Sequence, residues 1–378
     1  MTARPCLVFS IFLSSCANSV SAPATTSSPP SALISGAAAR PSTPTESTGL
    51  TPSGQSSTST VTELAATSVS LPGATGPISI DFIAYEPKRK RVWVPVGDTG
   101  SVDVFDIATN AFTRVDGFKT VEREAHGKTR VMGPSSVSVG DGVVYIGNRG
   151  TSEVCSVDEE SLKLGHCIKL STPPDCVAFV AATKEVWVTT PKDQSLTILD
   201  ASNPQLLKDK IVMKMPGQPE GYAVDQGAGV FYTNLEDKNQ TLVIDIKTHT
   251  IQSSWDTGCG DDGPRGVAFD SRRKFVFVAC TSGVQILDGA HAGSHLGKLE
   301  TGAGVDNIEY LESTKSLYVA AGKAARLTVA RVDDKGQPTI SDTGTTALGA
   351  RNAVVDPSGN VFLVDSVGAR LLVFTVTK

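Results

Sequence analysis

Seven aromatic residues recur along this chain at intervals of 41 to 52 residues. Around them lie short segments rich in Val, Ile and aromatics, such as GYAV, GVFYTN and TLVIDI between residues 221 and 246, separated by turn residues. Self-similarity at this period, with three or four strands per copy, is typical of a β-propeller. The sequence therefore predicts an all-β, seven-bladed β-propeller. The seven aromatic residues are Trp93, Tyr145, Trp187, Phe231, Phe277, Tyr318 and Phe362.

The two ends of the repeat region complement each other. The seventh copy stops at Lys378 after its third strand, whereas residues 66–73 (ATSVSLPG) resemble the fourth-strand segment IVMKMPG of the third copy. We therefore expect the propeller domain to span residues 66–378. We also expect its N-terminal strand to complete the last blade, which leaves no open sheet edge.

The residues before the repeat predict export. Residues 1–16 (MTARPCLVFSIFLSSC) carry one Arg, a short apolar run and then small residues, as a signal peptide does. The run is too short for a membrane-spanning helix. LSSC resembles the bacterial lipobox, which implies lipidation of Cys16; an ordinary secretory signal is the alternative. The predicted location is the periplasm, or the outer membrane or cell surface as a lipoprotein.

Residues 17–65 are rich in Ser, Thr, Pro and Ala and predict a disordered linker. Beyond them the chain has five cysteines, and export permits disulfides. Cys155 and Cys167 are twelve residues apart across one expected hairpin, so we predict that they are bonded. The odd number leaves at least one free thiol, or one bonded outside the domain.

The charge balance argues against a nucleic-acid partner. The net charge is −5 and the isoelectric point is about 5.6, so the composition gives no sign of a broad basic face. No dinucleotide or P-loop motif lies between a strand and a helix. We expect a monomer that meets the membrane only through a lipid anchor.

One position per blade, ten to twelve residues before each aromatic, is expected at the mouth of the central channel, and six of the seven are ionisable. Two interpretations remain open: ion pairs between blades, which are often only structural, or a ligand site. Asp175 has no cation at the flanking positions, so a cationic group, a metal ion or ligand hydroxyls should meet it. No cofactor is predicted, with a divalent cation at the mouth as the alternative. The seven positions are Asp81, Ser135, Asp175, Glu220, Arg265, Asp306 and Arg351.

Loops on the same face add further candidates. The segment between Asp116 and Pro134 is about eight residues longer than its counterparts, and we expect it to fold over the acidic side so that His126 or Arg130 reaches Asp175. A solvated surface loop is the alternative. The loops after the second strands contribute Asn148, Arg149, Asn234 and Asp365.

The copies PRGVAFDSRRKFVFVA, PEGYAVDQGAGVFYTN and GPSSVSVGDGVVYIGN resemble the YVTN-repeat (YncE-like) seven-bladed propellers of bacterial envelopes. The resemblance covers the whole repeat region. It implies the fold but not one activity, because the superfamily includes non-catalytic binding proteins, lactonases and dehydrogenase subunits.

The sequence favours an exported, lipid-anchored binding or scaffolding module that uses the mouth face, with a small polar ligand or an envelope protein as partner. A lactonase-like hydrolase at the same mouth is the alternative. In that case His126 or a metal ion would activate water, and Arg265 and Arg351 would hold a carboxylate or an oxyanion.

Overall fold

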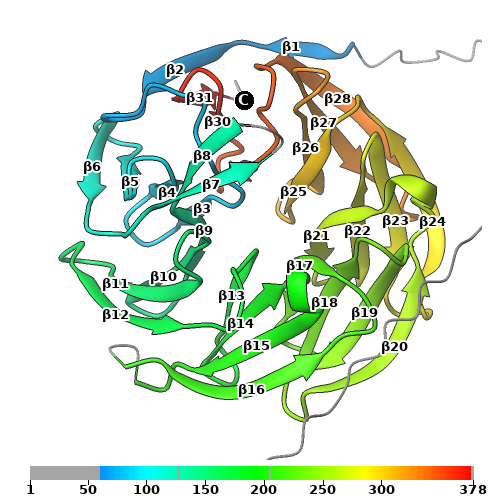
Figure 1. Ribbon diagram of the computed structural model, residues 1–378. Coiled ribbons are helices and arrows are strands. Elements are labelled where there is room, and N and C mark those ends of the chain that lie inside the picture. Colours follow the sequence, from blue (N-terminus) through cyan, green and yellow to red (C-terminus); the bar gives the residue numbers. More distant parts are fainter. Residues whose placement is uncertain (1–59, 126–127, 204–205, 376–378) are drawn as a thin grey trace, which may run out of the picture. The chain divides into compact units, whose positions relative to one another are not determined.

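The computed structural model describes residues 60–125, 128–203 and 206–375. Seven sheets are arranged around a central axis (Figure 1), so the predicted seven-bladed, all-β fold is confirmed. In each sheet the strand nearest the axis comes first in the repeat. These inner strands are β3 (Ala84–Glu86), β9 (Pro134–Val139), β13 (Val177–Val180), β17 (Pro219–Asp225), β21 (Pro264–Asp270), β25 (Val305–Leu311) and β29 (Ala353–Val355).

Each inner strand pairs antiparallel with a second strand, and the second with a third. The second strands are β4 (Arg91–Val96), β10 (Val143–Asn148), β14 (Glu185–Thr190), β18 (Val230–Leu235), β22 (Phe275–Cys280), β26 (Ser316–Ala321) and β30 (Val361–Asp365). The third strands are β5 (Ser101–Asp106), β11 (Glu153–Asp158), β15 (Ser195–Asp200), β19 (Gln240–Asp245), β23 (Gly283–Asp288), β27 (Arg326–Val332) and β31 (Arg370–Phe374).

The fourth, outer strands are β6 (Ala111–Val115), β12 (Leu164–Lys169), β16 (Lys208–Lys214), β20 (Thr250–Asp256), β24 (Ser294–Glu300), β28 (Pro338–Thr345) and, in the last blade, β2 (Ala66–Ser70). β2 pairs antiparallel with β31 over its whole length, so the last blade takes its outer strand from the N-terminal side of the repeat. Two short 3-10 helices, η1 (Pro191–Asp193) and η2 (Gly260–Asp262), lie in connections. The described residues hold no helix long and apolar enough to cross a membrane.

Ordered structure begins before residue 66, the predicted start of the domain. β1 (Thr62–Leu64) adds a fifth strand to the sixth blade by pairing parallel with β28. The Leu64 side chain is buried between the sixth and seventh blades, and Glu63 accepts a 2.6 Å hydrogen bond from the hydroxyl of Thr343. These contacts explain why three residues assigned to the disordered linker form a strand.

The hydrophobic core consists of seven clusters, one at each interface between neighbouring blades. All seven repeated aromatics are at most 3 % exposed. In the fourth blade, for example, Phe231 is paired with Val224 on one side and Ile244 on the other, and its ring packs on Trp187 of the third blade. Because each sheet buries both faces against neighbours, the strands read as nearly continuous apolar runs.

Acidic residues at strand ends stabilise the turns. Asp245 ends β19, and its Oδ1 accepts hydrogen bonds from the amides of Lys247 and Thr248 at 2.9 and 2.7 Å. Asp106, at the end of β5, binds the amides of Ala108 and Thr109 in the same way. These aspartates recur in the sequence because side-chain oxygens of this kind satisfy turn amides.

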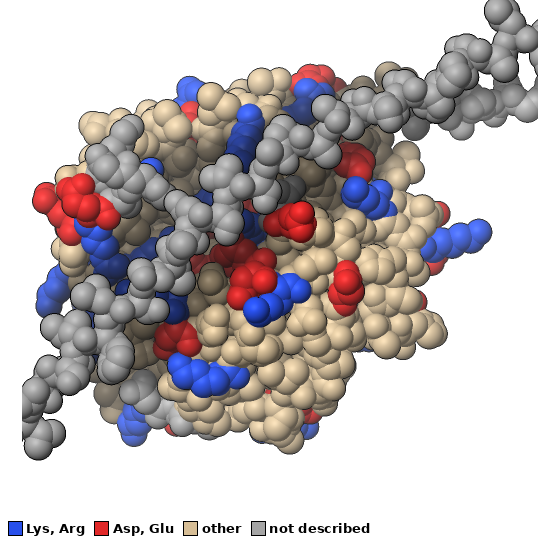
Figure 2. All heavy atoms as spheres, turned by 45° about the vertical axis from the view of Figure 1, so that its right-hand side comes forward, with Lys and Arg blue, Asp and Glu red and all other residues tan. Residues whose placement is uncertain are grey.

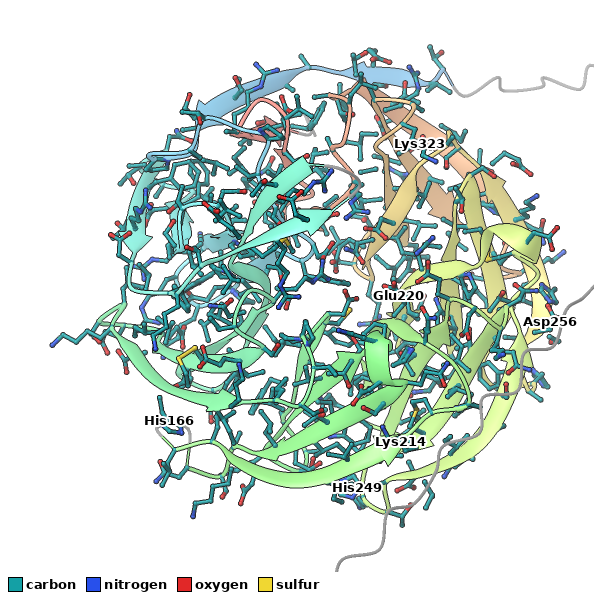
Figure 3. All side chains as sticks on the ribbon, in the orientation of Figure 1. His166, Lys214, Glu220, His249, Asp256 and Lys323 are labelled. Carbon is teal, nitrogen blue, oxygen red and sulfur yellow. A yellow bond between two sulfur atoms is a disulfide. The ribbon has the colours of Figure 1, made fainter. Side chains whose placement is uncertain are left out.

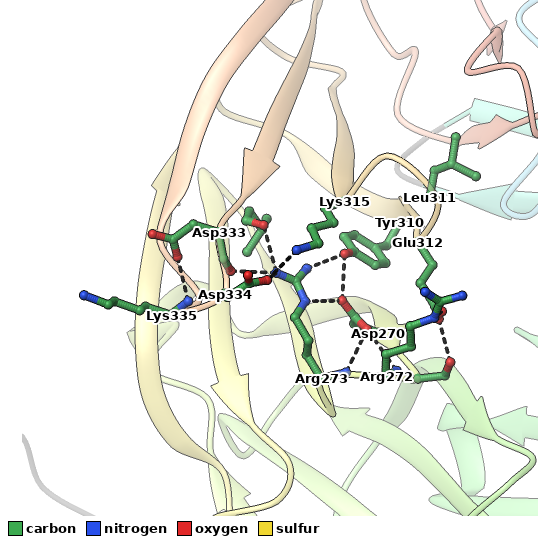
Figure 4. A network of polar contacts seen from close by, with 12 residues as sticks. Asp270, Arg272, Arg273, Tyr310, Leu311, Glu312, Lys315, Asp333, Asp334 and Lys335 are labelled. Carbon is green, nitrogen blue, oxygen red and sulfur yellow. Dashed lines mark hydrogen bonds and ion pairs between the residues drawn. The ribbon is translucent and has the colours of Figure 1, made fainter. Parts of the chain in front are cut away.

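Polar contacts also join blades (Figure 4). Arg273 donates to Asp270 Oδ2 at 2.7 Å in its own blade and to the carbonyls of Val332 and Asp333 of the sixth blade at 2.9 and 2.6 Å. The Tyr310 hydroxyl donates to the same Asp270 oxygen at 2.7 Å. This network fixes the fifth blade against the sixth on the face away from the channel mouth.

Candidate binding site at the channel mouth

The mouth of the channel is formed where the chain enters each inner strand. Ser135, Glu220, Arg265 and Asp306 lie in the first two residues of their strands, whereas Asp81, Asp175 and Arg351 come two or three residues before theirs. Backbone contacts fix this position. The amide of Asp81 donates to the carbonyl of Ser135 in the next blade at 2.9 Å, and the amide of Asp175 to that of Thr189 at 2.9 Å.

Three guanidinium groups cross-link the acids of the mouth. Arg351 lies between Asp81 and Asp306, at 2.9 and 3.0 Å. Arg149 contacts both Asp81 and Asp175. We call these five residues, together with Glu220, Arg265 and Glu236, the charge ring.

Arg265 completes the charge ring on the remaining side. It contacts Glu236 and lies 3.7 Å from Glu220. Figure 3 shows Glu220 near the centre of the propeller, unlike the peripheral His166, His249 and Asp256. The predicted positions therefore do form ion pairs between blades. The interpretation as structural ion pairs and the interpretation as a ligand site concern the same residues of the mouth.

Among the described residues, the cation that contacts Asp175 is Arg149, which lies outside the long loop. Arg149 follows β10 in a turn held by its own amide, which donates to the carbonyl of Gly133 at 3.0 Å. Arg130 instead lies near Asp98, whose pKa is raised by burial and lowered in part by the Arg130 charge. His126 lies outside the described residues. Arg149 was expected on this face as a loop residue after the second strand, without an assigned role.

The long loop folds as an antiparallel hairpin of β7 (Val121–Ala125) and β8 (Lys128–Met132), on the inner side of the ring of blades in Figure 1. Its base is tied to the second blade: Asn148 Nδ2 donates to the carbonyl of Lys119 at 2.9 Å, and Arg123 to that of Gly150 at 3.0 Å. The described part of the hairpin therefore supports the turn that carries Arg149.

Burial decides the protonation of the charge ring. Burial alone would lower the pKa of Arg149, but Asp81 and Asp175 raise it, so the guanidinium stays charged. Burial, and then the neighbouring Asp175, raise the pKa of Glu220 far above its usual value, which leaves its carboxyl neutral at pH 7. Burial raises the pKa of Asp306 to about 6, despite the opposing effect of Arg351.

Three other predicted residues brace the backbone. Asn234 Nδ2 donates to the carbonyl of Arg265 at 2.7 Å, and so holds the strand entry that carries this guanidinium. Asp365 accepts from the amide of Gly368 and from Arg370 Nε, each at 2.8 Å. Asn148 fixes the hairpin base as described above. The hydroxyl of Ser135 is buried with no hydrogen-bond partner among the described residues.

A hollow of about 380 Å³ lies beside the charge ring, over the fifth to seventh blades. Arg265, Arg351 and Lys323 line it against a single acid, Asp306. Lys323, labelled in Figure 3, forms no ion pair with any described residue. Leu348, which is 65 % exposed, adds an apolar edge. We call this the basic hollow.

One buried thiol lies at the described part of the mouth. Cys176 lies beneath the charge ring, with Sγ 3.4 Å from the carbonyl of Glu220, but burial raises the pKa of its thiol well above the usual value, so it is not a thiolate. No group of three or more metal-binding side chains occurs within the described ranges. His249 is bound to Glu185 at 3.1 Å, far from the mouth in Figure 3.

Two disulfides are present. One joins Cys155 and Cys167 across the hairpin of β11 and β12, the pair proposed from the sequence. The other joins Cys259 to Cys280 and ties the DTGCGDDGPR loop to the end of β22. The second pair was not predicted, because its partners meet only where the loop between β20 and β21 passes the end of β22 in the next blade. Of the cysteines that the structure describes, Cys176 is the one with a free thiol.

No family model matches the chain, and no curated protein matches it. Solved structures with the same fold include a chain of the Mitotic Checkpoint Complex, with 11 % identity, a TM-score of 0.66 and coverage of 82 % of this chain and 94 % of that one. Kuenenia stuttgartiensis hydrazine synthase has 14 % identity, a TM-score of 0.66 and coverage of 81 % and 98 %. Streptogramin B lyase has 9 % identity, a TM-score of 0.64 and coverage of 83 % and 98 %. At these identities the likeness defines the class, a seven-bladed β-propeller, and nothing finer.

Proposed function

We propose that this propeller is a non-catalytic binding module whose mouth face recognises a small molecule carrying a carboxylate or phosphate. The main support is that the arginine side chains of the charge ring are more exposed to solvent than the carboxylates with which they pair. The Arg351 side chain is 44 % exposed, against 10 % for Asp81 and 16 % for Asp306. The surface offered to a ligand is therefore cationic, although the network beneath it is rich in acids.

The basic hollow gives this surface a shape. Its volume suits a small ligand, and Lys323 supplies a charge that no described acid neutralises. Planar guanidinium groups such as those of Arg265 and Arg351 match the geometry of carboxylate and phosphate oxygens. On the side that Figure 2 draws, acidic and basic side chains lie next to one another in several places.

Titration calorimetry with succinate and inorganic phosphate at low ionic strength tests this proposal. We expect binding that weakens with added salt, and a five- to tenfold loss of affinity in Lys323→Gln, because one of three converging cations is removed. Lys247→Gln, at an exposed turn of the fourth blade, is the matched control and should bind as the unaltered protein does. Equal affinities in the two variants would contradict the site, and binding of neither anion would point to a protein partner.

The lactonase alternative has less support. Its candidate base, His126, lies outside the described residues, and the other candidate groups near the mouth are a neutral Glu220 and a buried thiol. Lactone turnover that disappears on His126→Ala would overturn the non-catalytic proposal.

We further propose that the chain belongs with the YVTN-repeat envelope propellers and is exported as a lipoprotein. The leader, the LSSC motif and two disulfides support this, because disulfides persist in oxidising compartments. Residues 1–59, with Cys16, lie outside the described ranges. Cys16→Ser should move the protein from the membrane fraction to the soluble envelope fraction. An unchanged distribution would contradict the anchor.

A further inference from the structure

The central channel below the charge ring contains a second cavity, of about 530 Å³. The inner strands of six blades line it. Its lining begins next to the charge ring, at Phe82, Asn307 and Asn352, and reaches Ser271 in the turn after β21. Asn307 Nδ2 donates to the carbonyl of Asp81 at 3.0 Å and so joins the sixth blade to the first at the ring end. This cavity, which we call the channel cavity, is therefore distinct from the basic hollow.

Most residues around the cavity are apolar or aromatic, but many of these side chains pack between the blades: the ring of Tyr222 stacks on Phe231 and that of Tyr310 on Phe277. Most of the polar groups already have partners. The Tyr222 hydroxyl donates to the carbonyl of Val177 at 2.8 Å, and the Tyr310 hydroxyl to Asp270 at 2.7 Å. Ser138 Oγ accepts from the amide of Phe179 at 2.9 Å. These groups are used by the fold and do not call for a ligand.

Two polar side chains in the channel cavity are left without partners. Glu309 of β25 is half-buried and makes no hydrogen bond or ion pair with any described residue. Asn352, which is 3 % exposed, has its Oδ1 buried with no hydrogen-bond partner. A buried acceptor such as Asn352 Oδ1 is costly to leave unpaired, and the partly exposed Glu309 carboxylate lies in the same cavity, so both groups can accept from a donor supplied from outside.

The charged and titratable residues that line the cavity indicate what kind of donor would bind there. Among the described residues that line it there is no Lys, Arg or His, and the titratable ones besides Glu309 are Tyr85, Tyr222 and Tyr310. An anion would be repelled by the Glu309 carboxylate. A metal ion fits poorly, because a hard cation takes six or more oxygen ligands. Phe82, at the ring end of the lining, adds an aromatic side chain that suits a cation with an apolar body.

We propose that the channel cavity binds an organic cation, an ammonium group on an apolar or aromatic body, with the Glu309 carboxylate as its counter-ion. The volume lies within the range of small-molecule sites. This site does not rest on the function proposed for the mouth, which concerns anions on the other side of the charge ring.

The full chain is titrated with 4-phenylbutylamine, and with 4-phenyl-1-butanol and 4-phenylbutyrate as neutral and anionic counterparts, by calorimetry at pH 8. We expect the amine to bind at least tenfold more tightly than the alcohol, and the butyrate not to bind. Glu309→Gln keeps the shape of the side chain, so it should lower the amine affinity about tenfold and leave the alcohol within twofold. Glu300→Gln, on the exposed outer strand β24, is the matched control.

The pH dependence gives an independent readout. Burial raises the pKa of Glu309 to about 7, so its carboxylate is lost as the pH falls through that value. The amine affinity should therefore drop about tenfold from pH 8 to pH 6, while that of the alcohol stays constant. Equal affinities of the unaltered protein and Glu309→Gln for the amine, or binding of none of the three probes, would overturn the proposal.

Discussion

At the scale of single residues, the charge ring shows what sequence spacing misses. The seven mouth positions were found because they share one column of the repeat, but Arg149 belongs to another column, one residue after β10. It reaches Asp175, 26 residues away in sequence, because the turn and the hairpin base hold it toward the mouth. No local pattern marks this contact. The sequence signal that could have indicated it is a second column of charged residues, in the loops after the second strands on the same face.

Removal of the Arg149 charge should be strongly destabilising. Arg149→Met keeps the aliphatic stem but leaves Asp81 and Asp175 without their shared cation, and breaking a buried ion pair in this way costs about 3–5 kcal/mol. The free energy of unfolding in urea measures the loss. The control is Arg272→Met, whose side chain is 84 % exposed in its pair with Glu312 and should cost under about 1 kcal/mol. Similar losses in both variants would mean that the charge ring contributes no more than a surface pair.

At the scale of elements, the repeat predicted the four-stranded blades. It did not predict β1 or the hairpin of β7 and β8, which are added to the blades. The four-stranded units follow from alternating apolar segments and turn residues, which are local properties. β1 carries no such pattern, since only Leu64 in TEL is apolar. β1 forms a strand because the outer edge of β28 offers unpaired backbone groups. The interface between the sixth and seventh blades also has room for the Leu64 side chain. The hairpin of β7 and β8 was likewise visible only as extra length.

β1 should contribute measurably to stability. A chain that starts at residue 60 keeps it, whereas one that starts at Ala66 loses the buried Leu64 side chain, worth about 1.5–3 kcal/mol. We expect the shorter chain to melt a few degrees lower in a thermal scan. Leu64→Ala in the longer chain should reproduce most of this loss, and Val61→Ala, at a site that is 47 % exposed, should not. Equal melting temperatures for the two chains would contradict a stabilising role for β1.

At the scale of the whole molecule, seven blades bury one cluster at each of seven interfaces, and their first strands leave a channel that the charge ring narrows at one end. The two candidate sites differ in chemistry because of this arrangement. The mouth collects ionisable residues from every blade and exposes its cations, whereas the channel cavity is walled by apolar strand residues and holds one unpaired carboxylate. We therefore propose an anion site and a cation site on one axis of a single chain.

The sequence by itself determined the number of blades, the strand order within them and the mouth positions, because repeats and alternation are written along the chain. It also suggested one disulfide, since Cys155 and Cys167 lie across a single hairpin. Only the tertiary structure decided which charges meet. Arg149 with Asp175, Cys259 with Cys280, and the isolation of Glu309 in the channel cavity all depend on distances between separate segments. Burial then sets the protonation of the acids, and burial is a property of the closed ring rather than of any one repeat.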